Sequence, residues 1–492
     1  MTDAPPSEPV SLARRTVRNT ALLFTARSLS KVLVFATVVV TQRALGATGY
    51  GQFAAIVVFS NIASIFADLG LQVVFVREAS RHLDDLGQFL AVTLAAKLPL
   101  AALSGVILAV SVWLLAPDLL PLVGPVFALL VVTSAANLLR SNFYATGEMR
   151  YEVVAIGGET VVLLVATVLA ALLKQGVAAF IWAYTASYAF TTVYAAVITQ
   201  RRWAPLRLSW NGELLRKLLR SGLPFALAFV LSTIYFRIDV VILKSLRGDA
   251  QVAYYNAAYK FLDGLSFIPQ AAMNAVFPAL AVIHLRGRDP MRDAYTRAYR
   301  LLAALGMPVA VGCVILAPQI IHITRVPFDQ SIPSLRILGA SLLLIFVNNS
   351  FIFALGAMDK QLTFALLAGL SIVVNVTLNL VMIPRFGYAD GYLAASWATL
   401  ITEVFLFVCG YVALRRYLGH MPWLRPAIPI VLSGAAVAAV AWVLRDHNVV
   451  LVVAVSAVLY AGVMAVTGGV TRSEWTLARE ALHLRRGRAP AP

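Results

Sequence analysis

Long apolar stretches recur along the whole chain, and short polar or charged intervals separate them. An α-helix needs about 20 residues to cross the hydrocarbon of a bilayer, and the stretches lack the alternation over roughly 10 residues that is typical of outer-membrane barrel strands. Only helices satisfy their own backbone in lipid, so the pattern predicts an all-α polytopic membrane protein. Fourteen segments are predicted, near residues 19–42, 52–76, 88–115, 121–145, 152–173, 178–199, 221–244, 251–282, 298–318, 333–356, 362–383, 389–413, 426–444 and 449–470.

Composition supports the same class. Hydrophobic residues make up 60% of the chain and charged residues 13%, whereas a soluble domain carries roughly 25% charged residues. The mean hydropathy is +0.82. These values exclude a soluble enzyme of this length.

The net charge of +17 follows from membrane topology rather than from a nucleic-acid surface. With the N-terminus in the cytoplasm, and with residues at segment ends counted in the adjoining loop, the predicted inner loops and termini hold 26 Lys and Arg residues, the outer loops hold eight, and six lie within segments. This asymmetry is the positive-inside pattern. It predicts that both termini are cytoplasmic, and an even number of segments is consistent with it.

The chain divides into two halves at a basic connection. A short internal sequence similarity supports the division. In the first half Ala44-Leu45-Gly46 precedes Tyr50-Gly51-Gln52, and in the second half Ser245-Leu246-Arg247 precedes Val252-Ala253-Tyr254. Such a similarity is expected of a transporter built from parallel repeats. The predicted parts are a cytoplasmic arm (1–18), an N-lobe of six helices (19–200), a basic cytoplasmic linker (201–220), a C-lobe of six helices (221–415), two extra transmembrane helices (416–470) and a basic cytoplasmic tail (471–492).

Charged residues inside the apolar segments are the functional candidates. A charge within a membrane helix is costly unless it pairs or faces water. Arg27 and Lys31 are four residues apart and share a helix face. Arg237 and Asp239 lie two residues apart and point to different faces.

A second group of polar residues lies deeper along the chain. Asn256, Lys260 and Asp263 recur at helical spacing, and the last two can pair with each other. Asp68 precedes a Leu-Gly interruption, where a structural pair and a transport role are both open. Glu403 is isolated and is a candidate for binding a proton or a cation.

Three further polar sites can be explained without a role in ion coupling. Lys97 is followed two residues later by Pro99, which suggests an irregular backbone that lines a cavity. Arg140 lies toward the inner end of its segment, where snorkelling to the interface explains it as well as ligand binding does. Asn375 and Asn379 share a helix face, and hydrogen bonds between helices are their expected role.

The chain carries no pattern of an enzyme. The six His residues lie in loops or near segment ends without metal-ligand spacing, Cys313 and Cys409 are far apart, and no Walker motif or nucleophile elbow is present. No loop is long enough for a soluble catalytic domain. We therefore expect no catalytic residue, no metal and no cofactor.

Several short motifs, in order and spacing, resemble the bacterial polysaccharide transporters (Wzx-type, O-antigen flippases) of the multidrug/oligosaccharidyl-lipid/polysaccharide (MOP) exporter superfamily. The resemblance covers nearly the whole chain. Its motifs are Leu45-Gly46 with Tyr50-Gly51-Gln52-Phe53, Asp68-Leu69-Gly70-Leu71 before Arg77-Glu78, Arg237-Ile238-Asp239 with Tyr254-Tyr255-Asn256-Ala257-Ala258-Tyr259, and Asn375 and Asn379 with Ile383-Pro384, Phe386-Gly387 and Gly391.

The resemblance implies a fold and a function. The fold is two six-helix lobes around a central cavity, plus two C-terminal helices. The function is flipping of an undecaprenyl-diphosphate-linked oligosaccharide across the bacterial cytoplasmic membrane by alternating access. Polysaccharide polymerase and glycosyltransferases are expected partners, besides membrane lipids and H⁺ or Na⁺ as the coupling ion.

On this basis the charged residues take provisional roles. Arg27, Lys31, Arg237 and Lys260 are expected to line the cavity and bind the anionic diphosphate. Asp68, Asp239, Asp263 and Glu403 are candidates for coupling to a proton or sodium gradient.

Three alternatives stay open. A peptidoglycan-precursor (lipid II) flippase would share the cationic cavity. A multidrug/cation antiporter of the same superfamily would favour an anionic one, whereas basic residues slightly outnumber acidic ones within the segments. A membrane enzyme or an assembly scaffold of the glycan pathway is disfavoured by the short loops.

Overall fold

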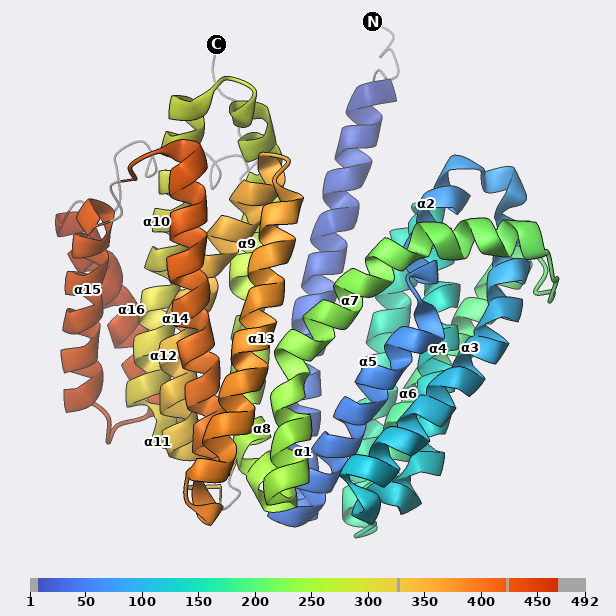
Figure 1. The fold of residues 1–492 in the computed structure, drawn as a ribbon, viewed down its shortest axis with the longest axis horizontal. Helices are drawn as coiled ribbons and strands as arrows, with labels where there is room; N and C mark the ends of the chain where they lie inside the picture. Colours follow the sequence, from blue (N-terminus) through green and yellow to red (C-terminus); the bar gives the residue numbers. More distant parts are fainter. Residues whose placement is uncertain (1–7, 325–327, 422–423, 468–492) are drawn as a thin grey trace, which may run out of the picture. The chain divides into compact units, whose positions relative to one another are not determined.

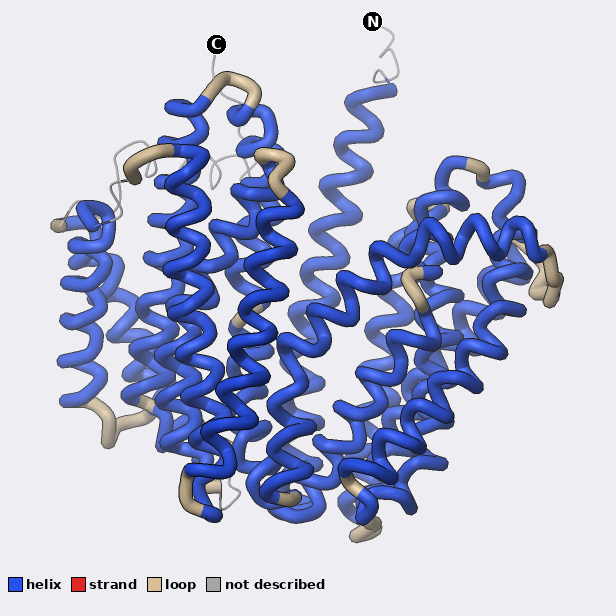
Figure 2. Tube along the Cα trace, viewed as in Figure 1, coloured by secondary structure: helices blue, strands red, loops and turns tan. Residues whose placement is uncertain are grey.

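The computed structural model describes residues 8–324, 328–421 and 424–467. These residues are helical almost throughout and contain no β-strand (Figure 2). The predicted basic tail 471–492 and the first seven residues of the predicted arm 1–18 lie outside the described residues. The all-α polytopic fold that the apolar pattern predicts is confirmed.

The helices of the N-terminal half follow one another with short connections (Figure 1). They are α1 (Glu8–Asp68), α2 (Leu71–Arg81), α3 (Leu86–Leu115), α4 (Val123–Ala145), α5 (Met149–Leu172), α6 (Val177–Arg202) and α7 (Gly212–Arg247), with short 3₁₀ turns η1 (Leu83–Asp85) and η2 (Pro117–Leu122).

The second half continues the pattern. It consists of α8 (Asp249–Leu265), α9 (Phe267–His284), α10 (Arg288–Ile315), α11 (Ala317–Ile323), α12 (Ser331–Ala357), α13 (Gln361–Arg385), η3 (Tyr388–Asp390), α14 (Gly391–Leu418), α15 (Leu424–Val443) and α16 (Val449–Val466).

The predicted apolar segments fall on helices, with two differences in connection. The first segment and most of the second join into α1, which is interrupted by the non-helical backbone of Gly46. The long eighth segment divides into α8 and α9 at Ser266. In the described residues, eleven helices are long and apolar enough to cross a membrane, and Ala427–Val443 is a shorter apolar helix.

The chain forms two compact units by contact. One contains residues 1–256 and 379–391, and the other contains 257–378 and 392–492. In the first unit, α1 packs against α3 and α5, while α6 packs against α4 and α5. Phe143 is buried at its centre, with its ring centroid 5.8 Å from those of Tyr151 and Trp203.

Two glycine turns with the same backbone geometry support the internal repeat. Gly46 has φ 63° and ψ −170°, and Gly248, between α7 and α8, has φ 80° and ψ −170°. L-residues rarely adopt this conformation, so glycine is the residue that suits both turns. By backbone geometry, Gly46 therefore corresponds to Gly248 in the repeat. The sequence similarity aligns Gly46 with Arg247 instead, which is one residue earlier.

The second of these turns is held by charged side chains. Lys244 lies 2.5 Å from both Asp118 and Asp249. Arg247 donates hydrogen bonds to the carbonyls of Ile383, Pro384 and Phe386. These bonds satisfy carbonyl groups at the end of α13 that the helix itself leaves open, and they explain why residues 379–391 belong to the first unit.

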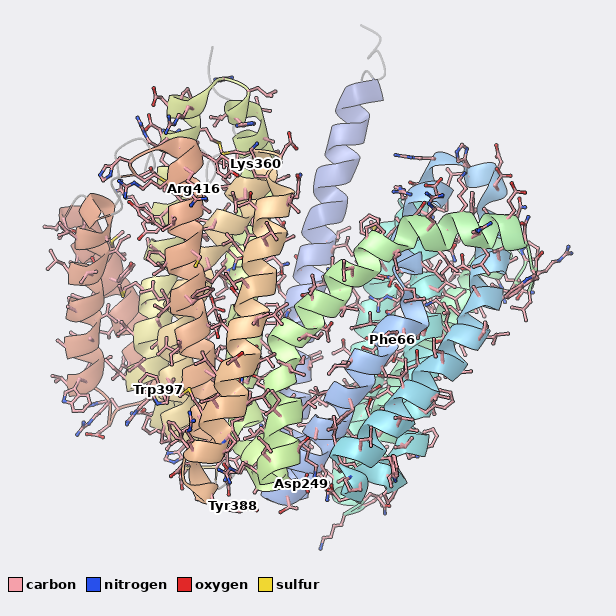
Figure 3. All side chains as sticks on the ribbon, in the orientation of Figure 1. Phe66, Asp249, Lys360, Tyr388, Trp397 and Arg416 are labelled. Atoms are coloured by element: carbon pink, nitrogen blue, oxygen red, sulfur yellow. The ribbon has the colours of Figure 1, made fainter. Side chains whose placement is uncertain are left out.

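The second unit has its own core, built by α9, α10 and α12. Tyr295 and Phe351 stack there with centroids 6.0 Å apart. Figure 3 shows Lys360 and Arg416 at the same end of this unit, with Trp397 toward the other end. Both basic residues belong to regions that the charge count assigns to the cytoplasm; that orientation stays a prediction.

Gly51 provides a test of the first unit's packing. A Cβ at this position would lie 1.9 Å from the backbone oxygen of Asp249. We expect Gly51→Ala to destabilise the protein by about 1–3 kcal/mol, since the backbones cannot separate without disturbing the turn. Thermal unfolding of the purified protein in detergent measures this effect.

The matched control is Gly157→Ala, because a Cβ at the exposed Gly157 meets nothing within 4 Å. Equal unfolding midpoints for the two variants would contradict the close packing of Gly51.

Candidate functional site

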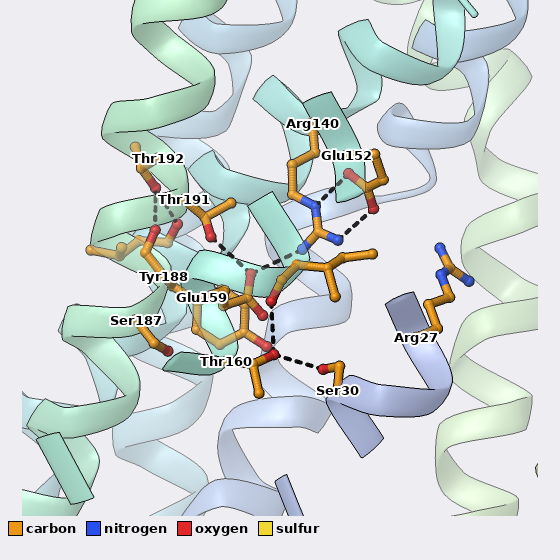
Figure 4. A network of polar contacts seen from close by, with 12 residues as sticks. Arg27, Ser30, Arg140, Glu152, Glu159, Thr160, Ser187, Tyr188, Thr191 and Thr192 are labelled. Atoms are coloured by element: carbon orange, nitrogen blue, oxygen red, sulfur yellow. Dashed lines mark hydrogen bonds and ion pairs between the residues drawn. The ribbon is translucent and has the colours of Figure 1, made fainter. Parts of the chain in front are cut away.

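A buried group of charged side chains joins α4, α5 and α6 (Figure 4). The Arg140 guanidinium donates from Nε to Glu152 Oε2 at 3.0 Å and from Nη2 to Glu152 Oε1 at 2.5 Å. Its Nη1 donates to Glu159 Oε2 at 3.0 Å, and the Thr191 hydroxyl donates to the same oxygen at 2.9 Å. One guanidinium therefore holds two carboxylates.

Helical spacing brings these residues together. Glu152 and Glu159 are seven residues apart on α5, which places them two turns apart on one face. Arg140 and Tyr144 are four residues apart on α4 and likewise share a face. The turn between the two helices contains Gly147 at φ 70°, and it returns α5 alongside α4.

Tyr144 connects this group to α1. Its hydroxyl donates to Glu152 Oε1 at 2.7 Å and accepts from Arg27 Nη2 at 2.7 Å. One turn beyond Arg27, the hydroxyls of Ser30 and Thr160 lie 2.7 Å apart and join α1 to α5. Arg27 is thereby positioned at the edge of the buried group.

A cavity opens at this position. Its volume is about 440 Å³. Its lining consists of Arg27, Gln72, Val73, Val76, Asn137, Arg140, Tyr144, Glu152 and Phe229. Charged and phenolic groups share this lining with apolar side chains, so an anion in the cavity would meet two guanidinium groups in a surrounding of low polarity.

The charges of the group balance. Arg27 and Arg140 carry two positive charges, and Glu152 and Glu159 carry two negative charges. The Glu152 side chain is fully buried and that of Arg140 is 15% exposed. An unpaired charge at such a position costs several kcal/mol, so the mutual pairing is what makes these side chains tolerable there.

A second charged pair, of a buried lysine and a partly exposed aspartate, lies in the same unit. The Lys97 ammonium is 2.9 Å from Asp68 Oδ1 and 2.8 Å from Ser134 Oγ. Asp68 ends α1, just before Leu69 and Gly70, whose φ angles are 45° and 74°. The structure thus shows that Asp68 is paired, and its role in ion coupling stays a prediction.

Asp239 and Arg237 are close in sequence but differ in surroundings. The buried Asp239 carboxylate accepts hydrogen bonds from the Tyr255 hydroxyl and, at 2.8 Å, from the backbone N–H of Val240. Arg237 is only half-buried. The sequence predicts that the two side chains point to different faces of the helix, and their different burial is consistent with that prediction.

The second unit contains two further acidic candidates. Lys260 and Asp263 pair at 3.7 Å within α8, as their spacing predicts. Glu403 on α14 is buried and accepts a hydrogen bond at 2.7 Å from Asn348 on α12. Asn375 donates to Thr402 at 3.3 Å between α13 and α14, so its predicted role in joining helices is confirmed.

The sequence analysis did not predict the ion pairs of Arg140 with Glu152 and Glu159. The buried ion pairs of Arg140 argue against the snorkelling explanation, because its guanidinium bonds carboxylates inside the unit. The spacing of Glu152 and Glu159 was a usable signal, since two carboxylates on one face of a membrane helix require a cation. Among the described residues, no group of His, Cys, Asp and Glu is arranged to hold a metal ion.

Lys97 with Asp68 gives a prediction about stability. Lys97→Met leaves the Asp68 carboxylate, which is 24% exposed, without its cation. We expect this loss to cost about 1–3 kcal/mol, because the carboxylate is only partly solvated. The double variant Asp68→Asn/Lys97→Met carries no such charge and should regain most of this loss. Thermal unfolding midpoints of the two variants test the expectation, which is wrong if the double variant is no more stable than the single one.

Comparisons with known proteins cover most of the chain. Residues 16–284 match the family described as polysaccharide biosynthesis protein, and residues 204–471 match the family described as lipid II flippase MurJ. No curated protein matches the sequence.

Solved structures share the fold at low identity. The lipid II flippase MurJ in an inward closed conformation is 15% identical with a TM-score of 0.70, over 92% of this chain and 98% of that chain. An inward-facing multidrug resistance MATE family transporter of the MOP superfamily is 14% identical with a TM-score of 0.62, over 79% and 95%. An outward-facing structure of a MATE family transporter is 16% identical with a TM-score of 0.52, over 84% and 99%.

Proposed function

Because this chain belongs to the polysaccharide biosynthesis protein family, and with it to the flippases and transporters of the MOP superfamily, we propose that it flips an undecaprenyl-diphosphate-linked oligosaccharide. The substrate moves from the inner to the outer leaflet of the bacterial cytoplasmic membrane for assembly of a surface polysaccharide. Both termini lie in the cytoplasm in this proposal. The protein performs no catalysis, and its relatives are transporters.

The cavity beside Arg27 is the observation that carries this proposal. Two guanidinium groups, of Arg27 and Arg140, line one space of about 440 Å³. A diphosphate is strongly anionic, and guanidinium groups bind its oxygens in pairs. Attraction between these charges is stronger at a site of low polarity than in water.

Three further cations are proposed for the same role on the basis of their sequence positions. Lys31 lies one turn from Arg27 on α1 and is exposed, while Arg237 on α7 and Lys260 on α8 are half-buried. We assign Arg27, Lys31, Arg237 and Lys260 to binding the diphosphate. The polyprenyl tail remains in the bilayer, and polysaccharide polymerase and glycosyltransferases are the proposed partners.

Lipid II is the second candidate substrate. The match of residues 204–471 to the MurJ family favours it, and its diphosphate would use the same cations. A multidrug or cation antiporter is less well supported, because a cationic ligand would meet Arg27 and Arg140 in the cavity.

A flipping assay tests the proposal. Purified protein is placed in liposomes with a fluorescent polyprenyl-diphosphate oligosaccharide on both leaflets, and a membrane-impermeant glycosidase reports how fast the inner pool becomes accessible. We expect Arg27→Ala and Lys260→Ala each to slow this rate about tenfold or more, since a hydrogen bond to a charged group contributes roughly 1.5–3 kcal/mol.

Arg150→Ala is the matched control, because Arg150 is 64% exposed and pairs with Glu148 on the surface. No acceleration by the wild-type protein over empty liposomes, under an imposed ion gradient, would refute the glycan substrate. The same liposomes loaded with lipid II then test the second candidate.

Ion coupling is assigned to the acidic residues Asp68, Asp239, Asp263 and Glu403. Glu403 gives the sharpest test because it is buried and joins α14 to α12 through Asn348. Glu403→Gln should still allow flipping down a substrate gradient, and it should abolish the response to an imposed proton or sodium gradient. Liposomes with and without each gradient measure this difference.

Ser334→Ala is the control for Glu403→Gln. Ser334 also joins α12 to α14, through a 2.6 Å hydrogen bond to Ser396, but carries no charge. An unaltered gradient response in Glu403→Gln would remove Glu403 from the coupling site.

A further inference from the structure

Arg140, one of the two arginines that line the cavity, is already paired with a carboxylate of the protein. Arg140 presents two of its N–H groups in parallel to the two oxygens of Glu152, at 3.0 and 2.5 Å. This fork is the arrangement in which a guanidinium also holds two oxygens of a phosphate. Glu152 therefore has the position and the geometry of an anionic ligand.

Arg140, Tyr144 and Glu152 line the cavity together with Arg27, and Glu159 does not. The Arg140 side chain is 15% exposed and that of Glu152 is fully buried behind it. A ligand therefore reaches the Arg140 guanidinium first and takes the place of Glu152 only when the bonds between Arg140 and Glu152 open. The bond between Arg140 and Glu159, which also accepts from the Thr191 hydroxyl at 2.9 Å, can persist.

On the premise of the proposed function, we propose that Glu152 is an internal counter-anion, which occupies on Arg140 the place that an oxygen pair of the substrate diphosphate takes in the loaded carrier. Tyr144 extends this role to Arg27, because its hydroxyl bonds both Glu152 and Arg27. The cavity beside Arg27 is accordingly the diphosphate site, and Arg140 is one of its ligands.

The transport cycle explains why a carrier would need an internal counter-anion. A carrier that works by alternating access changes conformation twice in each cycle, once with substrate and once without. In the first passage the substrate pairs with Arg27 and Arg140, while Glu152 keeps the hydrogen bond from the Tyr144 hydroxyl. In the second passage the empty site would hold the two charges of Arg27 and Arg140 against Glu159 alone, which is unfavourable, and Glu152 supplies the missing negative charge.

Glu152→Gln separates this role from a purely structural one. The variant keeps the shape of the side chain and leaves Arg140 paired with Glu159, so the protein is expected to fold. Without the competing charge, Arg140 should bind inorganic pyrophosphate about tenfold more tightly than in the wild type, as judged by calorimetric titration of the purified protein. In the flipping assay the variant should show a lower KM and a lower kcat, because its empty form returns more slowly.

Glu148→Gln is the matched control. Glu148 lies four residues before Glu152, and its carboxylate pairs on the surface with Arg150 at 2.9 Å. Its removal should leave pyrophosphate affinity and both kinetic constants unchanged. Unchanged or weaker pyrophosphate binding in folded Glu152→Gln overturns the proposal, and so does an equal gain in Glu148→Gln.

The double variant Arg140→Gln/Glu152→Gln tests whether Arg140 is a ligand of the anion. It should bind pyrophosphate about tenfold or more weakly than Glu152→Gln, because one charged ligand of the anion is gone. Affinity equal to that of Glu152→Gln would show that Arg140 is not a ligand, which also overturns the proposal.

Two further measurements identify the molecule that supplies the anion. Titration in nanodiscs of phosphatidylcholine with and without phosphatidylglycerol tests a phospholipid headgroup, and competition by phosphatidylglycerol would overturn the assignment to the transported lipid. If Glu152→Gln binds pyrophosphate more tightly while the wild type flips no polyprenyl diphosphate, the counter-anion assignment stands and the proposed function fails.

Discussion

Compensation of charge in a medium of low polarity is the constraint on which this structure depends. In the first unit, Arg140 lies between two carboxylates and Lys97 bonds Asp68. Removing one partner would leave a charge without compensation, and this costs several kcal/mol where the remaining side chain is buried, as for Glu152. The helices α1, α3, α4 and α5 are therefore fixed by their charged residues as well as by their apolar packing.

The same constraint connects architecture to transport. A cavity that attracts an anion must contain cations, and those cations must be tolerated when the anion is absent. Arg27 meets this requirement partly by its exposure and partly through Tyr144. Arg140 meets it through Glu152, a residue of the same cavity lining whose side chain is fully buried. In the proposed transport cycle, substrate binding and the return of the empty carrier therefore depend on neighbouring residues.

The backbone conformation of a few glycines is a second constraint on the structure. Gly46 and Gly248 turn the chain in the same way at corresponding places of the two halves. The close approach of Gly51 to Asp249 leaves no space for a Cβ. The charged residues near the second turn, Lys244 and Arg247, bond groups that come from distant parts of the sequence.

The sequence by itself determined the class, the helices and most of the charged candidates. Apolar stretches of this length can only be membrane helices, and the spacing of Lys260 and Asp263 fixed their pairing. Only the tertiary structure decided that Arg140 binds Glu152 and Glu159, that Lys97 bonds Asp68 and that Asn348 bonds Glu403. Helical periodicity tells which face a side chain occupies, whereas its partner depends on which helix packs against that face, and that choice is made by contacts between residues far apart in the chain.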